Sequence, residues 1–265
     1  MTEITVDELA YYPLKSGRSL TTQSAYVTPK GLLNDRRWMV VDSHGRFLTA
    51  RTHPQLLRIT ARPKADGSLE LQNGSERPMR AKPRYPQATI DVEIWGCQTK
   101  GARFEASIDQ WLSDITGLEC HLVYMPQDVV RPIKSSPQDE VSYADGYPLL
   151  LTNQSSLADL NTRLMEPVSM DAFRPNVVIK GADAFAERHW EHVTIGSVSF
   201  KSGGECVRCA MTVLDPKTGQ KRTDGEPLKS LAGYQRTAQG VIFGVNLIPV
   251  SDGEIRVGDP VRLLD

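Results

Sequence analysis

Alternation of apolar and polar residues dominates the chain, and it predicts a protein built mainly from β-strands. Turn sequences rich in glycine, such as residues 43–46, separate several of the alternating segments. We predict strands over residues 4–14, 20–26, 37–41, 47–50, 56–62, 69–71, 89–95, 119–125, 173–179, 194–200 and 256–264.

Helical periodicity is confined to two segments. Residues 104–116 carry their apolar side chains on one face, and Gly117 is a suitable stop. A second helix is predicted to begin at a capping box that runs from Ser156 to Asp159. Many strands, two helices and no βαβ alternation predict a β-rich α+β protein with barrel-like parts, and they argue against Rossmann and thioredoxin folds.

Composition narrows the possible partners. The chain has 265 residues, of which 40% are hydrophobic and 24% charged, as in ordinary soluble proteins. Its net charge of -1 gives no basic field for nucleic acid or an anionic membrane. No apolar run reaches the roughly 20 residues that span a bilayer, and we see no secretory signal. Four cysteines in a chain of this length do not indicate a disulfide framework, so we expect a cytoplasmic protein.

The most informative chemistry lies in residues 203–209, which follow an alternating segment. Two glycines let the backbone approach a neighbour closely, and Cys206 and Cys209 then bracket Arg208. A thiolate beside a guanidinium indicates a soft metal ligand next to an anion site.

Three other interpretations of the two cysteines are open. They could be buried side chains with a purely structural role. They could form a zinc site together with His189 and His192, although this order of ligands is not that of a zinc finger. A redox dithiol is disfavoured, because such a pair precedes a helix whereas residues 210–213 are expected to continue as a strand.

Several basic residues lie where a turn meets a strand. Lys15, Arg36, Arg174 and Arg208 all occupy such positions, where free backbone N–H groups can join in anion binding. Arginine also offers two parallel hydrogen bonds to a phosphate. Spacing alone does not show that these side chains converge.

Seven short motifs occur in a characteristic order along nearly the whole chain. They are residues 12–16, 34–38, 144–148, 156–161, 173–176, 206–209 and 257–261. Together they resemble the MOSC family (molybdenum cofactor sulfurase C-terminal domain) with its own N-terminal β-barrel domain, and in particular its amidoxime-reducing members. The resemblance implies a β-barrel-like domain over residues 1–125 and a MOSC β-barrel domain over residues 126–265.

The resemblance also implies a molybdenum cofactor of the molybdopterin type between the two domains. In the family the second cysteine of the motif ligates molybdenum, so Cys209 is the expected metal ligand and catalytic residue. The positions that match cofactor contacts are Lys15, Ser16, Arg36, Gly146, Tyr147, Arg174, Asn176, Cys206, Val207 and Arg208. Gly146 stands where the animal enzymes have a hydroxyl side chain, so only its backbone could make that contact.

The implied activity is that of an oxidoreductase that reduces N-hydroxylated compounds by removing oxygen at molybdenum. Four cysteines, two of them in the site, do not suffice for an additional four-thiolate cluster, so a separate iron–sulfur, flavin or haem protein would supply electrons. A role for Asp145 in proton delivery stays open beside a structural one. Two alternatives to an enzyme also stay open: a carrier of cofactor or sulfur with a persulfide on Cys209, and a zinc-binding structural module.

Overall fold

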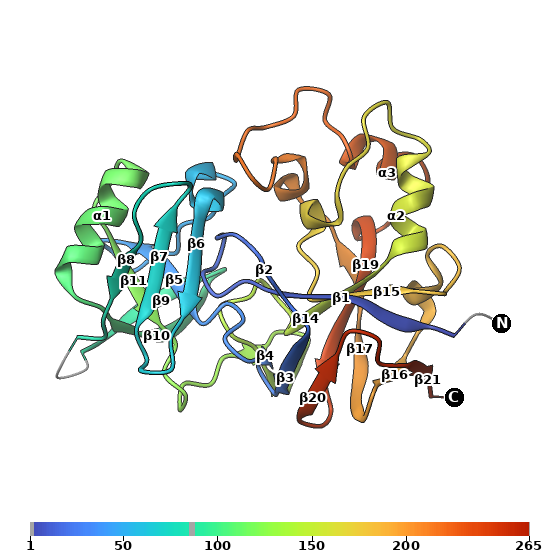
Figure 1. The fold of residues 1–265 in the computed structure, drawn as a ribbon, viewed down its shortest axis with the longest axis horizontal. Helices are drawn as coiled ribbons and strands as arrows, with labels where there is room; N and C mark the ends of the chain where they lie inside the picture. Colours follow the sequence, from blue (N-terminus) through green and yellow to red (C-terminus); the bar gives the residue numbers. More distant parts are fainter. Residues whose placement is uncertain (1–2, 85–87, 265) are drawn as a thin grey trace.

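The computed structural model describes residues 3–84 and 88–264, and it consists of two bodies that lie side by side (Figure 1). We call the body that contains helix α1 (Ala106–Thr116) the small body and the one that contains helices α2 (Gln154–Asn161) and α3 (Leu228–Tyr234) the large body. The α+β class dominated by strands is therefore confirmed.

The large body is built on a nine-stranded sheet in the order β2-β1-β15-β14-β19-β17-β16-β21, with β18 paired to β19. Its strands are β1 (Thr5–Tyr11), β2 (Leu20–Thr22), β14 (Leu149–Asn153), β15 (Val177–Lys180), β16 (His192–Ile195), β17 (Val198–Val207), β18 (Arg236–Thr237), β19 (Gly240–Pro249) and β21 (Val261–Leu263). A second sheet pairs β20 (Gly253–Arg256), β3 (Ser24–Thr28) and β4 (Gly31–Leu32).

The sheet of the large body is barrel-like without being a closed barrel. Among the described residues, the ladder of named strands is open between β2 and β21. A single antiparallel bridge between Thr5 and Pro260 brings β1 to the edge that carries β21. The N–H of Val261 donates to the Ile4 carbonyl at 2.8 Å across this gap, so the starts of β1 and β21 lie together.

The N-terminal strands belong in space to the large body. Strand β1 pairs antiparallel with β15, with Leu9 opposite Val177, and β3 pairs with β20. Val6 and Leu9 are fully buried in the core of the large body. The large body therefore contains segments from both ends of the chain, so a single boundary in the sequence does not separate the two bodies. The domain boundary after residue 125 stays a prediction.

The expectation that the chain has no βαβ alternation is wrong. Strands β14 and β15 pair in parallel, and helix α2 lies between them in the sequence. All five residues of β14 are buried, so it shows no alternation of apolar and polar positions. A strand buried on both faces has no period-2 pattern, so β14 was not predicted from the sequence.

The small body combines a four-stranded sheet, a three-stranded sheet and α1. The first sheet has the order β5-β11-β10-β9 and the second β6-β7-β8. Its strands are β5 (Trp38–Asp42), β6 (Ile59–Pro63), β7 (Leu69–Asn73), β8 (Met79–Ala81), β9 (Thr89–Ile94), β10 (Cys97–Arg103) and β11 (Cys120–Tyr124). Helix α1 buries Ile108 and Leu112 and ends at the left-handed Gly117, as predicted.

Several predicted boundaries and elements differ from the structure. The start of segment 56–62 is a 3-10 helix, η1 (Pro54–Arg58), because Pro54 favours a helix start, and segment 47–50 forms only an isolated bridge. Helix α2 is capped by Asn153, whose side chain accepts from the Ser155 N–H at 3.1 Å. The predicted capping box is wrong, because Ser156 lies inside the helix and is buried.

The remaining elements are short. They are the hairpin of β12 (Pro132–Ile133) and β13 (Ser136–Glu140), and the 3-10 helices η2 (Met170–Phe173), η3 (Ala186–His189) and η4 (Ala210–Val213). Residues 210–213, expected to continue a strand, therefore turn instead into η4 directly after Cys209. In the part of the chain that the structure describes, no helix is both long and apolar enough to cross a bilayer.

Candidate active site

A cavity of about 510 Å³ draws its lining from both bodies. Every residue that the sequence analysis assigned to the site lines this cavity, although the roles of these residues stay predictions. They are Lys15, Ser16, Arg36, Gly146, Tyr147, Arg174, Asn176, Cys206, Val207, Arg208 and Cys209. The structure thus brings together positions that lie up to two hundred residues apart in the sequence.

The cavity is strongly cationic although the chain as a whole is slightly acidic. Its basic lining residues are Lys15, Arg36, Arg51, Arg174 and Arg208. Its acidic lining residues, among those the structure describes, are Asp145 and Glu205. Glu205 pairs with Arg188, which lies outside the lining, so it does not offset the cavity cations. The cavity is therefore suited to an anionic ligand.

Cys209 lies where the long strand β17 gives way to η4. Its backbone is extended, with φ of -121°, and its carbonyl accepts from the Thr212 N–H at 3.1 Å. The Cys209 side chain is half-buried, and its sulfur has no hydrogen-bond partner among the described residues. A thiol held by its backbone but without a protein partner is available as a soft ligand.

Arg208 is fixed from both its backbone and its side chain. The Arg208 N–H donates to the Val241 carbonyl at 2.7 Å, which ties the cysteine loop to β19. One terminal nitrogen of its guanidinium donates to the Cys206 sulfur at 2.8 Å and the other to the Phe173 carbonyl at 2.6 Å. No carboxylate among the described residues neutralises this cation, which leaves its charge for a ligand.

Two arginines of the cavity lining share one aromatic ring. The guanidinium carbons of Arg36 and Arg174 lie 4.1 and 4.2 Å from the centroid of the Tyr12 ring. Both arginines have left-handed backbones, with φ of 47° and 57°. A positive φ in a non-glycine residue is uncommon and concentrates at functional sites, so the two positions are held there by their surroundings.

The two arginines differ in how they are neutralised. Arg36 pairs with the fully buried Asp35 at 2.6 Å and donates to the Asn176 side-chain oxygen at 3.0 Å. Arg174 has no carboxylate partner among the described residues, and burial lowers its pKa to about 10. It therefore remains charged at neutral pH and offers an uncompensated cation to the cavity.

Asn176 organises the strands around the cavity. Its side-chain oxygen also accepts from the Leu150 N–H at 3.2 Å, and its side-chain nitrogen donates to the Ala10 carbonyl at 3.2 Å. These contacts connect β14 to β1. The predicted cofactor contact of Asn176 would therefore come from a side chain that is already bonded to the protein.

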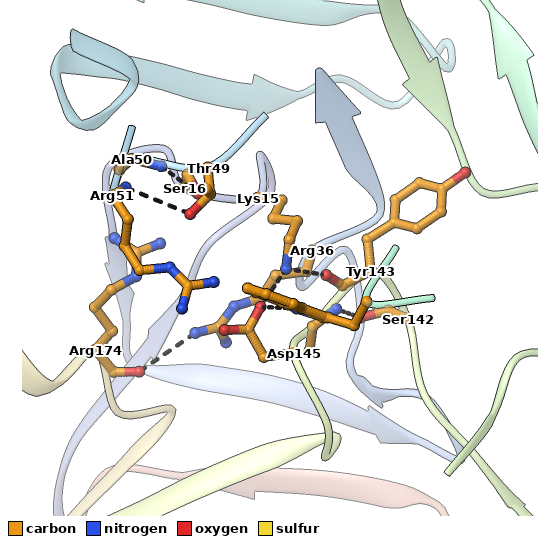
Figure 2. A network of polar contacts seen from close by, with 12 residues as sticks. Lys15, Ser16, Arg36, Thr49, Ala50, Arg51, Ser142, Tyr143, Asp145 and Arg174 are labelled. Carbon is orange, nitrogen blue, oxygen red and sulfur yellow. Dashed lines mark hydrogen bonds and ion pairs between the residues drawn. The ribbon is translucent and has the colours of Figure 1, made fainter. Parts of the chain in front are cut away.

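Lys15 and Asp145 form an ion pair in the wall of the cavity (Figure 2). Lys15 is only 5% exposed, and its ammonium also donates to the Tyr143 carbonyl at 2.9 Å. Burial lowers the pKa of Lys15, and Asp145 opposes that shift. Burial would raise the pKa of Asp145, but the ammonium of Lys15 holds it below its usual range. Asp145 is thus kept as a carboxylate, which makes it a poor proton donor.

The loop on the side of the small body is anchored through Ser16. Ser16 has a left-handed backbone, with φ of 65°, and its hydroxyl accepts from the Ala50 N–H at 3.1 Å (Figure 2). This bond holds Thr49 and Arg51 against the cavity, where both contribute to its lining. The small body therefore supplies one wall of the site through an irregular segment.

The glycines of β17 allow the close approach that the sequence indicated. A Cβ atom at Gly203 would lie 2.5 Å from the Tyr147 ring, whose hydroxyl is 2.8 Å from the Ser135 hydroxyl. No real side chain tolerates that distance, so the absence of a side chain at Gly203 permits the ring to approach the strand closely. Gly146 has open space around it and presents its backbone to the cavity.

Part of the lining was not predicted from the sequence. The additional polar and sulfur-containing residues are Thr49, Arg51, Glu205, Met211, Gln239 and Asn246. Thr49 and Arg51 share one irregular segment, and Glu205 and Met211 flank the cysteine motif, but nothing in their local sequence indicates that their side chains face the cavity. Asp145 was noted only as an open candidate, and the structure assigns it to the ion pair with Lys15.

The two histidines considered for a zinc site do not join the cysteines. Neither His189 nor His192 lines the cavity, and His192 lies exposed in β16. Within residues 3–84 and 88–264, no group of three or more histidine, cysteine or acidic side chains could hold a metal ion. The geometry therefore gives no support to a zinc module.

Comparison with known families identifies the class of protein. Residues 3–119 match the MOSC N-terminal beta barrel domain, and residues 138–262 match the MOSC domain. The chain belongs to the MOSC family, in the arrangement that joins these two domains.

Named relatives are similar over nearly the whole chain. The mouse mitochondrial amidoxime-reducing component 1 is 35% identical over 284 residues, covering 98% of this chain and 82% of the relative. Human component 1 is 31% identical over 281 residues (98% and 83%), and rat component 2 is 31% identical over 285 residues (98% and 84%). Those names place the relatives in mitochondria, while the cytoplasmic location of this chain stays a prediction.

Proposed function

We propose that this protein is a molybdenum-cofactor-dependent oxidoreductase that removes oxygen from N-hydroxylated substrates. One observation carries the proposal: among the described residues, the Cys209 thiol has no hydrogen-bond partner, and it lies in one cavity with Arg174 and Arg208, two cations that no described carboxylate pairs with. This donor set fits a group that combines a soft metal with an anionic, phosphate-bearing frame. The names of the related proteins support the same class of substrate.

The residues of the cavity have distinct parts in this proposal. The Cys209 thiolate would hold the metal, and Arg36, Arg174 and Arg208 would surround the anionic part of the cofactor. When bound, the cofactor would supply the two-electron redox chemistry and the position that takes up oxygen. The ion pair of Lys15 with Asp145 would place a fixed ammonium and a fixed carboxylate at the cavity wall without adding net charge.

The overall reaction defines what else is required. Cleavage of an N–O bond with release of water consumes two electrons and two protons, so a hydroxylamine gives an amine and an amidoxime gives an amidine. A separate electron-donor protein with an iron–sulfur, flavin or haem centre would supply the electrons. Because Asp145 is held ionised, the protons would come from solvent at the open side of the cavity rather than from this carboxyl group.

Metal analysis of matched variants tests the proposal. We expect freshly purified protein to contain molybdenum and to reduce benzamidoxime with a chemical electron donor such as reduced methyl viologen. Cys209→Ala should lose both properties, whereas Cys97→Ser, at a half-exposed thiol outside the cavity, should keep both. Retention of molybdenum and turnover by Cys209→Ala would contradict the proposed ligand.

Two further outcomes separate the alternatives. Molybdenum that depends on Cys209, without turnover of any N-hydroxylated compound, would favour the carrier of cofactor or sulfur over the reductase. Zinc at one atom per chain would favour the structural module. The second outcome would also require a ligand set other than the one this cavity provides.

A further inference from the structure

An exposed tryptophan is presented at the rim of the cavity by a strained turn. Trp95 and Gly96 form the two-residue connection between β9 and β10, with Ile94 opposite Cys97 in the ladder. Both residues have left-handed backbones, with φ of 53° and 74°. Such a turn normally carries asparagine or glycine first, and a bulky side chain there is costly. Trp95 is nevertheless 46% exposed, so burial of its ring does not offset the unfavourable backbone conformation.

The indole of Trp95 is oriented toward the cavity by two contacts. Its N–H donates to the Asp145 carboxylate at 3.1 Å, and Asp145 belongs to the cavity lining. The Phe47 ring packs against the indole with a centroid distance of 4.6 Å and an interplanar angle of 58°. The tryptophan is thus a fixed platform at the edge of the site.

Arg51 lies on this platform. Its guanidinium carbon is 4.2 Å from the centroid of the Trp95 ring, within the range of a cation–π contact. Arg51 is exposed and lines the cavity, next to the network of Lys15, Arg36 and Arg174 (Figure 2). Its side chain forms neither a hydrogen bond nor an ion pair with any described residue.

The charges around Arg51 leave it available for a ligand. The charge of Arg51 acts on the Asp145 carboxylate at a distance, but the ion pair of Asp145 is with Lys15. The cations deeper in the cavity are those proposed to hold the cofactor. Arg51 is therefore an exposed lining cation that forms no ion pair with a described residue and is not among those proposed to hold the cofactor.

We propose that Arg51, braced on Trp95, is a recognition site for an anionic substituent, such as a carboxylate, on the N-hydroxylated substrate. The part about the substrate rests on the proposed reductase function, whereas the anion site itself does not. An aryl carboxylate suits Arg51 and Trp95 especially. The guanidinium can bind the carboxylate while the aromatic ring of the ligand packs against the edge of the indole.

Direct binding tests the anion site without any turnover. The probe is benzoate, with benzamide as its neutral counterpart, and binding is followed by tryptophan fluorescence. We expect benzoate to bind more tightly than benzamide, and Arg51→Gln to weaken benzoate about 3- to 5-fold, as for one partly exposed charge pair. Arg77→Gln, which removes an exposed arginine outside the cavity, should change nothing. Equal benzoate affinity in Arg51→Gln and Arg77→Gln would overturn the proposal.

Substrate selectivity tests the second part. For the wild type, kcat/KM should be higher for 4-carboxybenzamidoxime than for benzamidoxime, and Arg51→Gln should lower this ratio through KM. Trp95→Ala should lower it too, since Arg51 then loses its platform, while Trp95→Phe should retain more of it. A ratio unchanged in Arg51→Gln would overturn the inference and leave the reductase function intact. If the wild type reduces neither compound but benzoate binding still depends on Arg51, the anion site is supported and only the reductase function fails.

Discussion

The contact between Lys15 and Asp145 illustrates what single residues contribute to this site. The lysine is almost completely buried, while the Asp145 side chain is 66% exposed. A buried ammonium without a nearby negative charge is unfavourable, so the carboxylate is needed most for the stability of its partner. The pair therefore stabilises the folded protein, and it also keeps both Lys15 and Asp145 charged at the cavity wall.

Asp145→Asn should destabilise the protein. We expect the free energy of unfolding to fall by about 1–2 kcal/mol, below the range for fully buried pairs because Asp145 is partly exposed. Urea unfolding monitored by circular dichroism measures this change. Asp91→Asn, which breaks the exposed pair with Lys100 at 2.8 Å, is the matched control and should stay within about 0.5 kcal/mol of the wild type. An equal loss in both variants would mean that the burial of Lys15 does not increase the contribution of its ion pair to the free energy of unfolding.

The pH dependence of this difference has a defined direction. The folded protein lowers the pKa of Asp145 from its ordinary 3.8, so folding favours the ionised carboxylate. The resulting stabilisation is complete above pH 3.8 and is lost as the pH falls through the lower folded value. The stability gap between the wild type and Asp145→Asn should therefore narrow only in strongly acidic solution. A gap that closes between pH 5 and 7 would contradict this assignment.

At the residue scale, the sequence predicted the inner part of the site better than its rim. Cys209, Arg174 and the other predicted residues lie in short motifs that keep their order along the chain, and all of them line the cavity. Arg51 and Trp95 come from an irregular segment and a turn. Their significance depends on a contact of 4.2 Å between side chains 44 residues apart, which no local pattern encodes.

Strand β17 shows how an element is shaped around the site. It pairs with β19 through a register shift between Ser202 and Gly204, next to the position where the Tyr147 ring covers Gly203. Cys206, near the end of the strand, and Cys209, beyond it, follow this irregularity in the sequence. The end of the strand turns toward the cavity. The close backbone approach expected from the glycine pair is therefore found at Gly203, whereas Gly204 supplies a left-handed backbone with open space beside it.

Gly203→Ala should displace the Tyr147 ring, because the added methyl group would lie 2.5 Å from it. We expect a loss of about 1–3 kcal/mol in unfolding free energy, typical of overpacking, together with reduced molybdenum retention. Gly233→Ala is the control, since nothing lies within 4 Å of its Cβ position in α3 and alanine favours a helix. Adding Tyr147→Ala to Gly203→Ala should recover part of the loss in a double-mutant cycle. Strictly additive effects would show that the ring and the glycine do not interact.

At the element scale, the predictions failed where the local pattern was absent or overridden. The buried strands β14 and β19 lack a period-2 alternation along much of their length, so neither was predicted. The segment after Cys209 has a strand-like composition but turns into η4, with the Thr212 side chain donating to the Cys209 carbonyl at 3.0 Å. In both cases tertiary contacts outweigh intrinsic preference.

The whole molecule is held together by N-terminal strands that lie in the large body. Val6, Leu9 and Val27 are fully buried in the same core as Val177 and Val245. Between β1 and β3, the chain passes the small body and contributes Lys15 and Ser16 to the cavity. A single cut after residue 125 would imply one connection between the two bodies, but the chain crosses between them more than once. The cavity takes its lining from both bodies.

A fragment of residues 126–265 should therefore not fold alone. Without β1 and β3, strands β15 and β20 would each lose a hydrogen-bonded neighbour, and apolar core surface would be exposed. We expect this fragment to bind the dye ANS and to lack a cooperative unfolding transition. A fusion of residues 1–33 to residues 126–265 through a flexible glycine–serine linker should regain cooperative unfolding, because it restores both pairings. If the fragment alone unfolds cooperatively at the same urea midpoint as the fusion, the N-terminal strands are dispensable for folding. Residues 126–265 would then be an independently folding domain.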